Sequence, residues 1–390
     1  MKLGLLLGLL GAMGPLAIDL YLPAFPTLAQ EFGAPPAAVQ LSLVSFFFAL
    51  AMGPLAYGAL ADRYGRRPPL FGGLALFALA SIGCAAAPDI HWLIALRFLQ
   101  GLGACAGTVI ARSIIRDLHS GAAAARLMAT MYLVLGVSPV LAPLAGSLLL
   151  HVVGWRGLFL IIAGLVAASA LLVAVALPET HPHAKRAARP HRSPLADYRR
   201  LLADGRFVQL LFVAAGATAS AFVFVAGAPF VFAQHYALTP TQFSALIGLN
   251  AAGQIVSTQF SPPLMRRLGA ARLLHAVTLT VTTAGVALLA AILSGGAPLA
   301  LLVVLCLVAA CCVGLWLTPA AVTILDAHPE LAGSAAGLLS TVQLAYAAAV
   351  TALTSTLERG DGLGIASGYL LCGGVALLLC RRAFAHAPHR

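Results

Sequence analysis

The chain has 390 residues, of which 61% are hydrophobic and 9% are charged, and its formal net charge is +11. Because soluble globular domains carry about 25% charged residues, this composition excludes a protein whose surface faces water on all sides. In so apolar a chain the basic excess indicates membrane topology rather than nucleic-acid binding, and we expect no nucleic-acid partner.

Apolar runs of about 20 residues recur along the whole chain, and each is long enough to cross a ~30 Å hydrocarbon core as a helix. Glycine and proline inside these runs are tolerated in membrane helices, where neighbouring helices satisfy the freed backbone groups. The sequence therefore predicts an all-α membrane protein with six spans in each half of the chain. The first six are residues 3–28, 38–61, 69–87, 91–114, 124–150 and 154–177. The second six are residues 206–234, 242–265, 270–293, 297–323, 332–357 and 362–382.

The distribution of basic residues orients these spans. If both termini are cytoplasmic, 20 of the 23 Lys and Arg residues lie on or near the cytoplasmic side. Only Arg156 and Arg359 then lie outside, and Arg97 lies within a span. Because cytoplasmic segments of membrane proteins are enriched in Lys and Arg, we expect a multi-pass protein with both termini in the cytoplasm.

One basic, proline-bearing segment, residues 178–205, interrupts the apolar pattern. We predict that it is a cytoplasmic linker between two six-helix bundles, residues 1–177 and residues 206–390. Its Lys and Arg side chains can meet anionic headgroups, so membrane lipids are expected partners. A regulatory role of the linker is left open.

The two halves retain a trace of a common origin. Residues 60–65, LADRYG, align with residues 264–269, LMRRLG, at a constant offset of 204. Both segments follow the second span of their half. Parallel repeats of six helices are found in one large architecture of secondary transporters, which this alignment favours.

The reactive residues do not form the pattern of an enzyme or a metal site. All seven cysteines fall in predicted spans, and no Cys-x-x-Cys pair or Cys/His cluster has metal-ligand spacing. Acidic residues near the membrane faces are scattered singly, whereas a polytopic enzyme needs clustered His, Asp or Glu. We therefore expect neither an enzyme nor a metal or cofactor, and we rank a non-transporting receptor equally low.

Three sequence motifs resemble those of a known family. Residues 58–67, GALADRYGRR, are similar to the loop between spans two and three of the major facilitator superfamily. Residues 96–103, LRFLQGLG, resemble its fourth-span motif. Residues 142–147, APLAGS, resemble its fifth-span antiporter motif, but Ala142 and Ser147 stand where that motif has glycine.

Two further segments narrow the resemblance. Residues 19–26, DLYLPAFP, and residues 227–231, GAPFV, are similar to the twelve-span drug:proton antiporters of the Bcr/CflA subgroup. The resemblance covers essentially the entire chain and implies a major facilitator fold with alternating access. It implies a monomer that exports small-molecule drugs and antibiotics across the bacterial inner membrane in exchange for protons. An exporter of an endogenous metabolite or amino acid, with incidental drug efflux, is the alternative.

The resemblance assigns a conformational latch to the loop after span two. Its glycines permit a tight turn, and its arginines hold it on the cytoplasmic side. Asp62 would accept hydrogen bonds from the start of span eleven near Gly333, and Arg66 would pair with Asp117. Charges that only fix the topology are the alternative. The assigned residues are Gly58, Asp62, Arg63, Gly65, Arg66, Arg67 and Asp117.

Asp19 and Arg97 are ionisable residues placed well inside spans, where such residues mark functional sites by default. At 1.5 Å per residue, Asp19 lies ~12 Å from the outer end of span one and Arg97 ~9 Å from the outer end of span four. The antiparallel spans thus bring the two residues to a similar depth. We predict that a helix movement that alters their contact takes up or releases a proton, with a purely structural ion pair as the alternative.

Span five carries Pro139 and Pro143, each of which removes a backbone hydrogen bond and can bend the helix. Together with Ala142 and Gly146 they are predicted to form an antiporter motif that packs against span eight. Ordinary packing of small residues is the alternative.

A substrate cavity is expected near the midplane between the two halves. Aromatic side chains there could stack on planar or cationic drugs, and amides could hydrogen-bond to them. Each candidate could equally belong to the packing core of the helices. The candidates are Tyr21, Gln40, Phe46, Tyr132, Phe222, Asn250, Gln254, Trp316, Gln343 and Tyr346.

Overall fold

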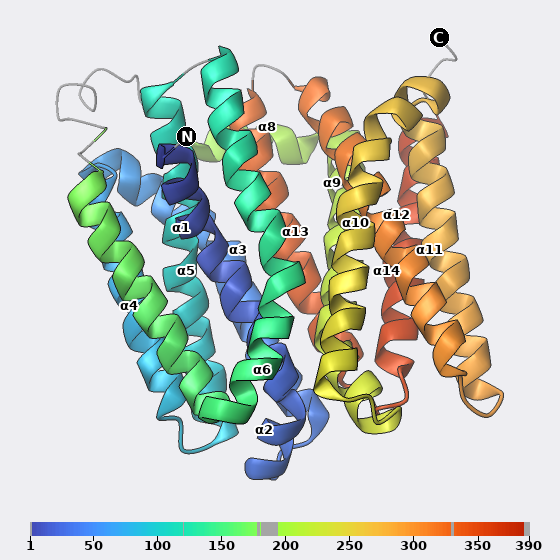
Figure 1. Cartoon of the computed structure of the whole chain (residues 1–390). Coiled ribbons are helices and arrows are strands. Elements are labelled where there is room, and N and C mark those ends of the chain that lie inside the picture. Colours follow the sequence, from blue (N-terminus) through green and yellow to red (C-terminus); the bar gives the residue numbers. More distant parts are fainter. Residues whose placement is uncertain (1, 120, 178–179, 181–193, 329–330, 386–390) are drawn as a thin grey trace. The chain divides into compact units, whose positions relative to one another are not determined.

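The computed structural model describes residues 2–119, 121–177, 180, 194–328 and 331–385, and the described chain is helical (Figure 1). It divides into two compact units, Met1–His191 (unit 1) and Arg192–Arg390 (unit 2). The predicted linker 178–205 lies partly outside the described residues, and its described end forms the helix α8 of unit 2.

Unit 1 is a bundle of long helices. Its elements are α1 (Lys2–Asp19), a 3-10 turn (Leu22–Ala24), α2 (Phe25–Glu31), α3 (Pro36–Tyr64), α4 (Arg67–Ala85), α5 (Ile90–Leu118) and α6 (Gly121–Ala176). Gly154, with φ +66°, bends α6 sharply. The two arms that result are visible in Figure 1 and correspond to predicted spans five and six.

Unit 2 repeats this organisation. Its elements are α8 (Pro194–Ala203), α9 (Gly205–Ala228), a π-helical extension (Pro229–His235), α10 (Pro240–Leu268), α11 (Ala270–Leu293), α12 (Leu299–Ala327), α13 (Ala332–Ser355) and α14 (Leu363–Ala385). With α6 counted as two, the described residues confirm a long helix for each predicted span. Ten described segments are apolar enough to be candidate spans, and α10, whose sequence includes several Ser, Thr and Gln residues, is long enough but not among them.

The predicted span over residues 3–28 matches one candidate span, Leu3–Glu31, but its helix is interrupted, because α1 ends at Asp19. Pro23 explains the break. It has no N–H to donate to the carbonyl of Asp19 four residues earlier, and its ring would clash with that carbonyl. Asp19 therefore lies at a helix terminus rather than in a continuous helix.

The trace of an internal repeat has a structural counterpart. Helices α3 and α10 each span 29 residues and begin with a proline. Each ends at a glycine in the left-handed region, Gly65 with φ +91° and Gly269 with φ +80°. The aligned segments therefore end equivalent helices in the two units, since glycine takes this conformation without steric penalty.

Close backbone contacts make α5 the central helix of unit 1, where it packs against α1, α3 and α4. A Cβ atom at Gly103 would lie 2.5 Å from the backbone nitrogen of Phe77 in α4. A Cβ atom at Gly107 would lie 2.5 Å from the carbonyl oxygen of Leu10 in α1. The small residues of α5 thus bring three helix backbones close together.

We predict that Gly103→Ala destabilises unit 1 by about 1–3 kcal/mol, because overpacking against a backbone cannot be relieved by a rotamer change. The matched control is Gly72→Ala, since no atom lies within 4 Å of a Cβ at that position of α4. Because alanine favours helix over glycine, the control variant should be as stable as the parent or more so. Thermal unfolding of the purified variants in detergent measures both effects, and equal melting temperatures would contradict the packing argument.

Candidate functional site

Arg97 lies at the centre of unit 1, and its side chain is fully buried. Its guanidinium carbon lies 4.2 Å from the ring centroid of Phe46, 4.8 Å from that of Tyr21 and 5.9 Å from that of Phe159. These rings come from three segments far apart in the chain. Together they form an aromatic cage, which stabilises a cation through the negative faces of the rings.

The cage leaves the guanidinium only partly hydrogen-bonded. Its Nη1 atom donates to the carbonyl oxygen of Ala17 at 3.3 Å and to Oε1 of Gln100. The Nε2 atom of Gln100 in turn donates to Oγ of Ser81 at 2.7 Å. The Nε and Nη2 atoms of Arg97 are buried without a hydrogen-bond partner among the described residues. Two donors are therefore free to bind a further acceptor, and leaving them unpaired is costly.

Asp19 lies close to this cage along the chain, two residues after Ala17, and is 7% exposed. No hydrogen bond or ion pair joins its carboxylate to any residue that the structure describes. The structure thus places Asp19 and Arg97 at the same level of unit 1 without an ion pair between them.

The polar residues that support this site, Gln100 and Ser42, are not among the residues predicted from the sequence. Gln100 stands three residues after Arg97 in the same motif, a spacing that places both on one helix face and could have revealed the contact. Ser42, which shares a 2.8 Å hydrogen bond with the hydroxyl of Tyr21, carried no such signal.

The predicted antiporter motif packs against the chain beside Asp19. Pro139, Ala142, Pro143 and Gly146 all lie on α6. A Cβ atom at Gly146 would lie 2.3 Å from the carbonyl oxygen of Leu20, so glycine is needed for this approach. The predicted contact of this motif with span eight stays a prediction.

A nearly buried ion pair joins the loop between α3 and α4 to the end of α5. The Nε atom of Arg66 lies 2.7 Å from Oδ2 of Asp117, and its Nη2 atom donates to Oδ1 at 3.2 Å. Only 5% of the Arg66 side chain and 15% of the Asp117 side chain are exposed. Thr180 donates a hydrogen bond of 3.4 Å to the same carboxylate. Arg67 donates to the carbonyl oxygen of Ala174 at 3.1 Å, so the loop is tied to both α5 and α6.

The other predicted latch residues have different surroundings. Gly65 ends α3, and Arg63 lies over the ring of Tyr64 at 5.2 Å. A Cβ atom at Gly58 would meet open space. The side chain of Asp62 and its predicted partner Gly333 lie outside the described side chains.

The predicted substrate residues of unit 1 occupy three places. Tyr21 and Phe46 belong to the cage of Arg97. Tyr132 is half exposed, and the guanidinium of Arg112 lies 5.8 Å from its ring centroid. Gln40 is buried, and its Nε2 atom has no partner among the described residues.

The predicted substrate residues of unit 2 lie at contacts between helices. Phe222 and Tyr346 pack beside one hydrophobic cluster of α9, α13 and α14. The amide of Asn250 donates to the carbonyl oxygen of Cys306, and the amide of Gln343 donates to that of Ala214. The backbone carbonyl of Gln254 accepts two side-chain hydrogen bonds, and Trp316 is fully buried. Among the described residues no group of three or more His, Cys, Asp or Glu could hold a metal ion.

Unit 2 contains a buried carboxylate that the sequence did not reveal, Glu358 in the loop between α13 and α14. Its Oε1 atom accepts hydrogen bonds from the backbone of Gly360 at 2.8 Å and Gly362 at 3.2 Å. Its Oε2 atom has no partner among the described residues. A Cβ atom at Gly227, in the predicted subgroup motif, would lie 3.5 Å from Oε2. Burial raises the pKa of Glu358 above its usual 4.5, although the backbone amides oppose this.

Comparisons with known proteins agree with this architecture. The profile of the Major Facilitator Superfamily matches residues 7–352. The MFS-type transporter YdgK of Bacillus subtilis (strain 168) is 34% identical over 92% of this chain and 89% of its own length. The bicyclomycin resistance protein homolog of Haemophilus influenzae is 27% identical over 91% of this chain and 89% of its own length. A crystal structure of the nucleoside transporter NupG has a TM-score of 0.74 at 14% identity, with full coverage of both chains, and shows the same fold.

We predict that Asp117→Asn destabilises unit 1 by about 3–5 kcal/mol, because it removes the carboxylate charge that lies against the buried guanidinium of Arg66. The control is Glu31→Gln at the pair between Glu31 and Arg156, whose side chains are 40% and 46% exposed. An exposed pair contributes about 0–1 kcal/mol, so this variant should be nearly neutral. Thermal unfolding measures the melting temperatures of both variants. Similar losses of melting temperature in Asp117→Asn and Glu31→Gln would show that the burial of the pair between Arg66 and Asp117 is irrelevant.

The buried carboxyl group of Glu358 should make the stability of unit 2 depend on pH. Because its folded pKa is raised, the stability that it contributes is fully present below pH 4.5 and is lost as the pH rises through the folded pKa. Glu358→Gln keeps an acceptor oxygen and cannot ionise. Relative to this variant, the parent should therefore lose melting temperature as the pH rises. Asp326→Asn, at an exposed position of α12, is the control. Parallel pH profiles of parent and Glu358→Gln would refute the assignment.

Proposed function

Because this chain belongs to the major facilitator superfamily, we propose that it exports small-molecule drugs in exchange for protons. Membership makes it a multi-pass membrane transporter rather than an enzyme. The observation that carries the proposal is the buried, unpartnered carboxylate of Asp19 at the level of the caged Arg97, with two donors of that arginine unused.

Proton coupling follows from the chemistry of this pair. An ionised carboxylate in the membrane interior requires a partner, and Nε and Nη2 of Arg97 are available donors. We propose that Asp19 pairs with Arg97 when it is ionised and separates from it when it is protonated. Gly146 allows α6 to lie against Leu20, so a movement at Asp19 is passed to α6. Protonation and the helix arrangement would thus be linked, as alternating access requires.

The ion pair of Arg66 and Asp117 is proposed as part of the latch that holds one state of the cycle. It fastens the loop between α3 and α4 to the end of α5 while Arg67 fastens it to α6. A bidentate pair of this kind is strong when formed, and its opening would release the loop from α5, which is what a latch needs.

The substrate class is proposed from chemistry and from the relatives. Beyond Asp19, Arg97 and Arg112, the predicted spans carry no acidic or basic side chain well inside them, which suits amphipathic drugs better than highly charged metabolites. The Haemophilus relative is named for bicyclomycin resistance, so bicyclomycin is the first substrate to test. We further propose a bacterial inner-membrane location with both termini in the cytoplasm, from the distribution of basic residues.

The experiment compares Asp19→Asn with the parent in inverted membrane vesicles that carry a proton gradient. We expect the drug-induced dissipation of the gradient to fall at least about tenfold, with drug binding retained, because the variant cannot exchange a proton. The control is Asp89→Asn, an exposed cap of α5 whose oxygen accepts hydrogen bonds from His91 and Trp92. Asparagine also caps helices, so coupling should persist in the control.

Full proton-coupled efflux by Asp19→Asn would overturn the proposed role of Asp19. Drug efflux that an uncoupler leaves intact would overturn proton coupling altogether. Coupled transport of an amino acid in preference to every drug of a resistance panel would favour the metabolite exporter.

A further inference from the structure

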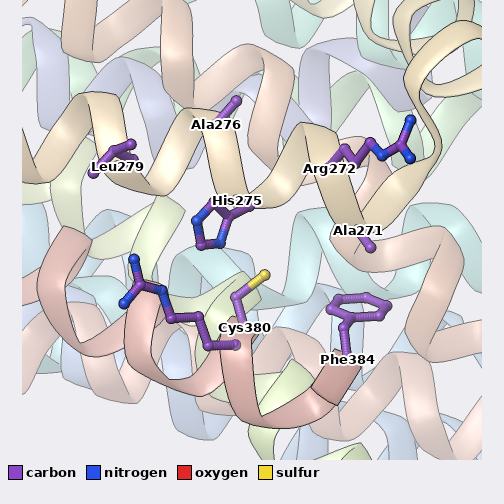
Figure 2. Close-up of a pocket in the computed structure, with 8 residues that line it drawn as sticks. Ala271, Arg272, His275, Ala276, Leu279, Cys380 and Phe384 are labelled. Carbon is purple, nitrogen blue, oxygen red and sulfur yellow. The ribbon is translucent and has the colours of Figure 1, made fainter. Parts of the chain in front are cut away.

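A cavity of about 520 Å³ opens at one end of unit 2, between the first turns of α11 and the last turns of α14. Figure 2 shows His275 of α11 pointing into the space beside Cys380 of α14, with Phe384 and Ala271 at the helix ends. Elsewhere these helices pack tightly. A Cβ atom at Gly285 would lie 2.5 Å from the backbone nitrogen of Leu370. The cavity is therefore a local feature of the end of this helix pair.

The cavity is electropositive. Among the described residues, its lining includes Arg272, His275 and Arg381 and no acidic residue. None of these three side chains has a hydrogen bond or ion pair with any residue that the structure describes. Arg206 adds a further cation, with its guanidinium carbon 5.7 Å from the ring centroid of Phe384. Basic pockets between membrane helices, at the level of the headgroups, bind anionic lipids.

The cavity continues into an exposed apolar strip. Leu279 lines it, one turn beyond His275, and is 42% exposed. Val286 and Leu293 follow at seven-residue intervals, so they lie on nearly the same face of α11, and they are 51% and 74% exposed. The strip from Leu279 to Leu293 is ~21 Å long, which exceeds the ~15 Å of one leaflet of the hydrocarbon core.

We propose that this cavity is a binding site for an anionic phospholipid. The phosphate lies between Arg272, His275 and Arg381. An acyl chain lies along the near part of the strip, from Leu279 to Val286. A soluble anion would use only the basic end of the site, and a zwitterionic lipid would bring an ammonium group toward the same arginines. The combination of a basic cavity and an adjoining apolar strip longer than one leaflet therefore selects a lipid with net negative charge.

The test titrates the purified full-length protein in detergent with dioleoyl phosphatidylglycerol and counts bound lipid by native mass spectrometry. Arg272→Gln combined with Arg381→Gln should weaken binding about thirtyfold, since each basic residue near the headgroups contributes roughly a fivefold change. Both side chains are exposed and unpaired among the described residues, so the folded state should persist, which size-exclusion chromatography and circular dichroism check. The matched control is Arg266→Gln combined with Arg267→Gln at the exposed end of α10. It removes the same charge outside the cavity and should change binding less than about threefold.

Three further titrations separate the sources of the anion. Dioleoyl phosphatidylcholine, with the same chains and no net charge, should bind at least about tenfold more weakly than the glycerol lipid. Dihexanoyl phosphatidylglycerol should also bind at least about tenfold more weakly, because most of the chain contact is lost. Inorganic phosphate should not displace the long-chain lipid. Equal losses in the two double variants, equal binding of the two dioleoyl lipids, or displacement by inorganic phosphate would each overturn the proposal.

Discussion

A guanidinium within the hydrocarbon region of a membrane is stable only if protein groups replace the water that it has lost. In unit 1 this requirement governs the placement of several helices around Arg97. Three aromatic rings cover the cation, and a relay through Gln100 to Ser81 satisfies one of its ends. The enclosure requires close helix packing, which the glycines of α5 permit. The enclosure leaves two guanidinium donors of Arg97 and the carboxylate of Asp19 without partners among the described residues. These are the groups on which the proposed proton coupling depends.

Much of the architecture could be predicted because its causes are local. Apolar length predicts the spans, and basic residues predict their orientation. Glycines at matching offsets predict that α3 and α10 end alike. The break after Asp19 was also readable, because Pro23 stands four residues later and removes the hydrogen bond that a continuous helix needs. The apolar pattern predicts the extent of the span and does not show this break within it.

The parts of the site that could not be predicted depend on tertiary contacts. Phe159 is an ordinary apolar residue in its own span and becomes part of the cage only when α6 packs beside α5. From the sequence, Glu358 would be taken for a solvent-exposed loop residue, because no pattern in the neighbouring residues predicts that its side chain is buried. Asn250 and Gln343 likewise donate to backbone carbonyls of a neighbouring helix in their own unit, contacts that the sequence of their own spans does not show.

The sharp bend at Gly154 has a consequence for how the chain enters the membrane. The two arms of α6 meet without an intervening loop, so they form a helical hairpin with Arg156 at its tip. By the predicted topology this arginine ends on the side where basic residues are disfavoured. Its partner Glu31 belongs to α2, which is synthesised 125 residues earlier. The carboxylate of Glu31 is therefore already in place when the hairpin with Arg156 inserts. The ion pair that then forms offsets part of the cost of moving the arginine across the membrane.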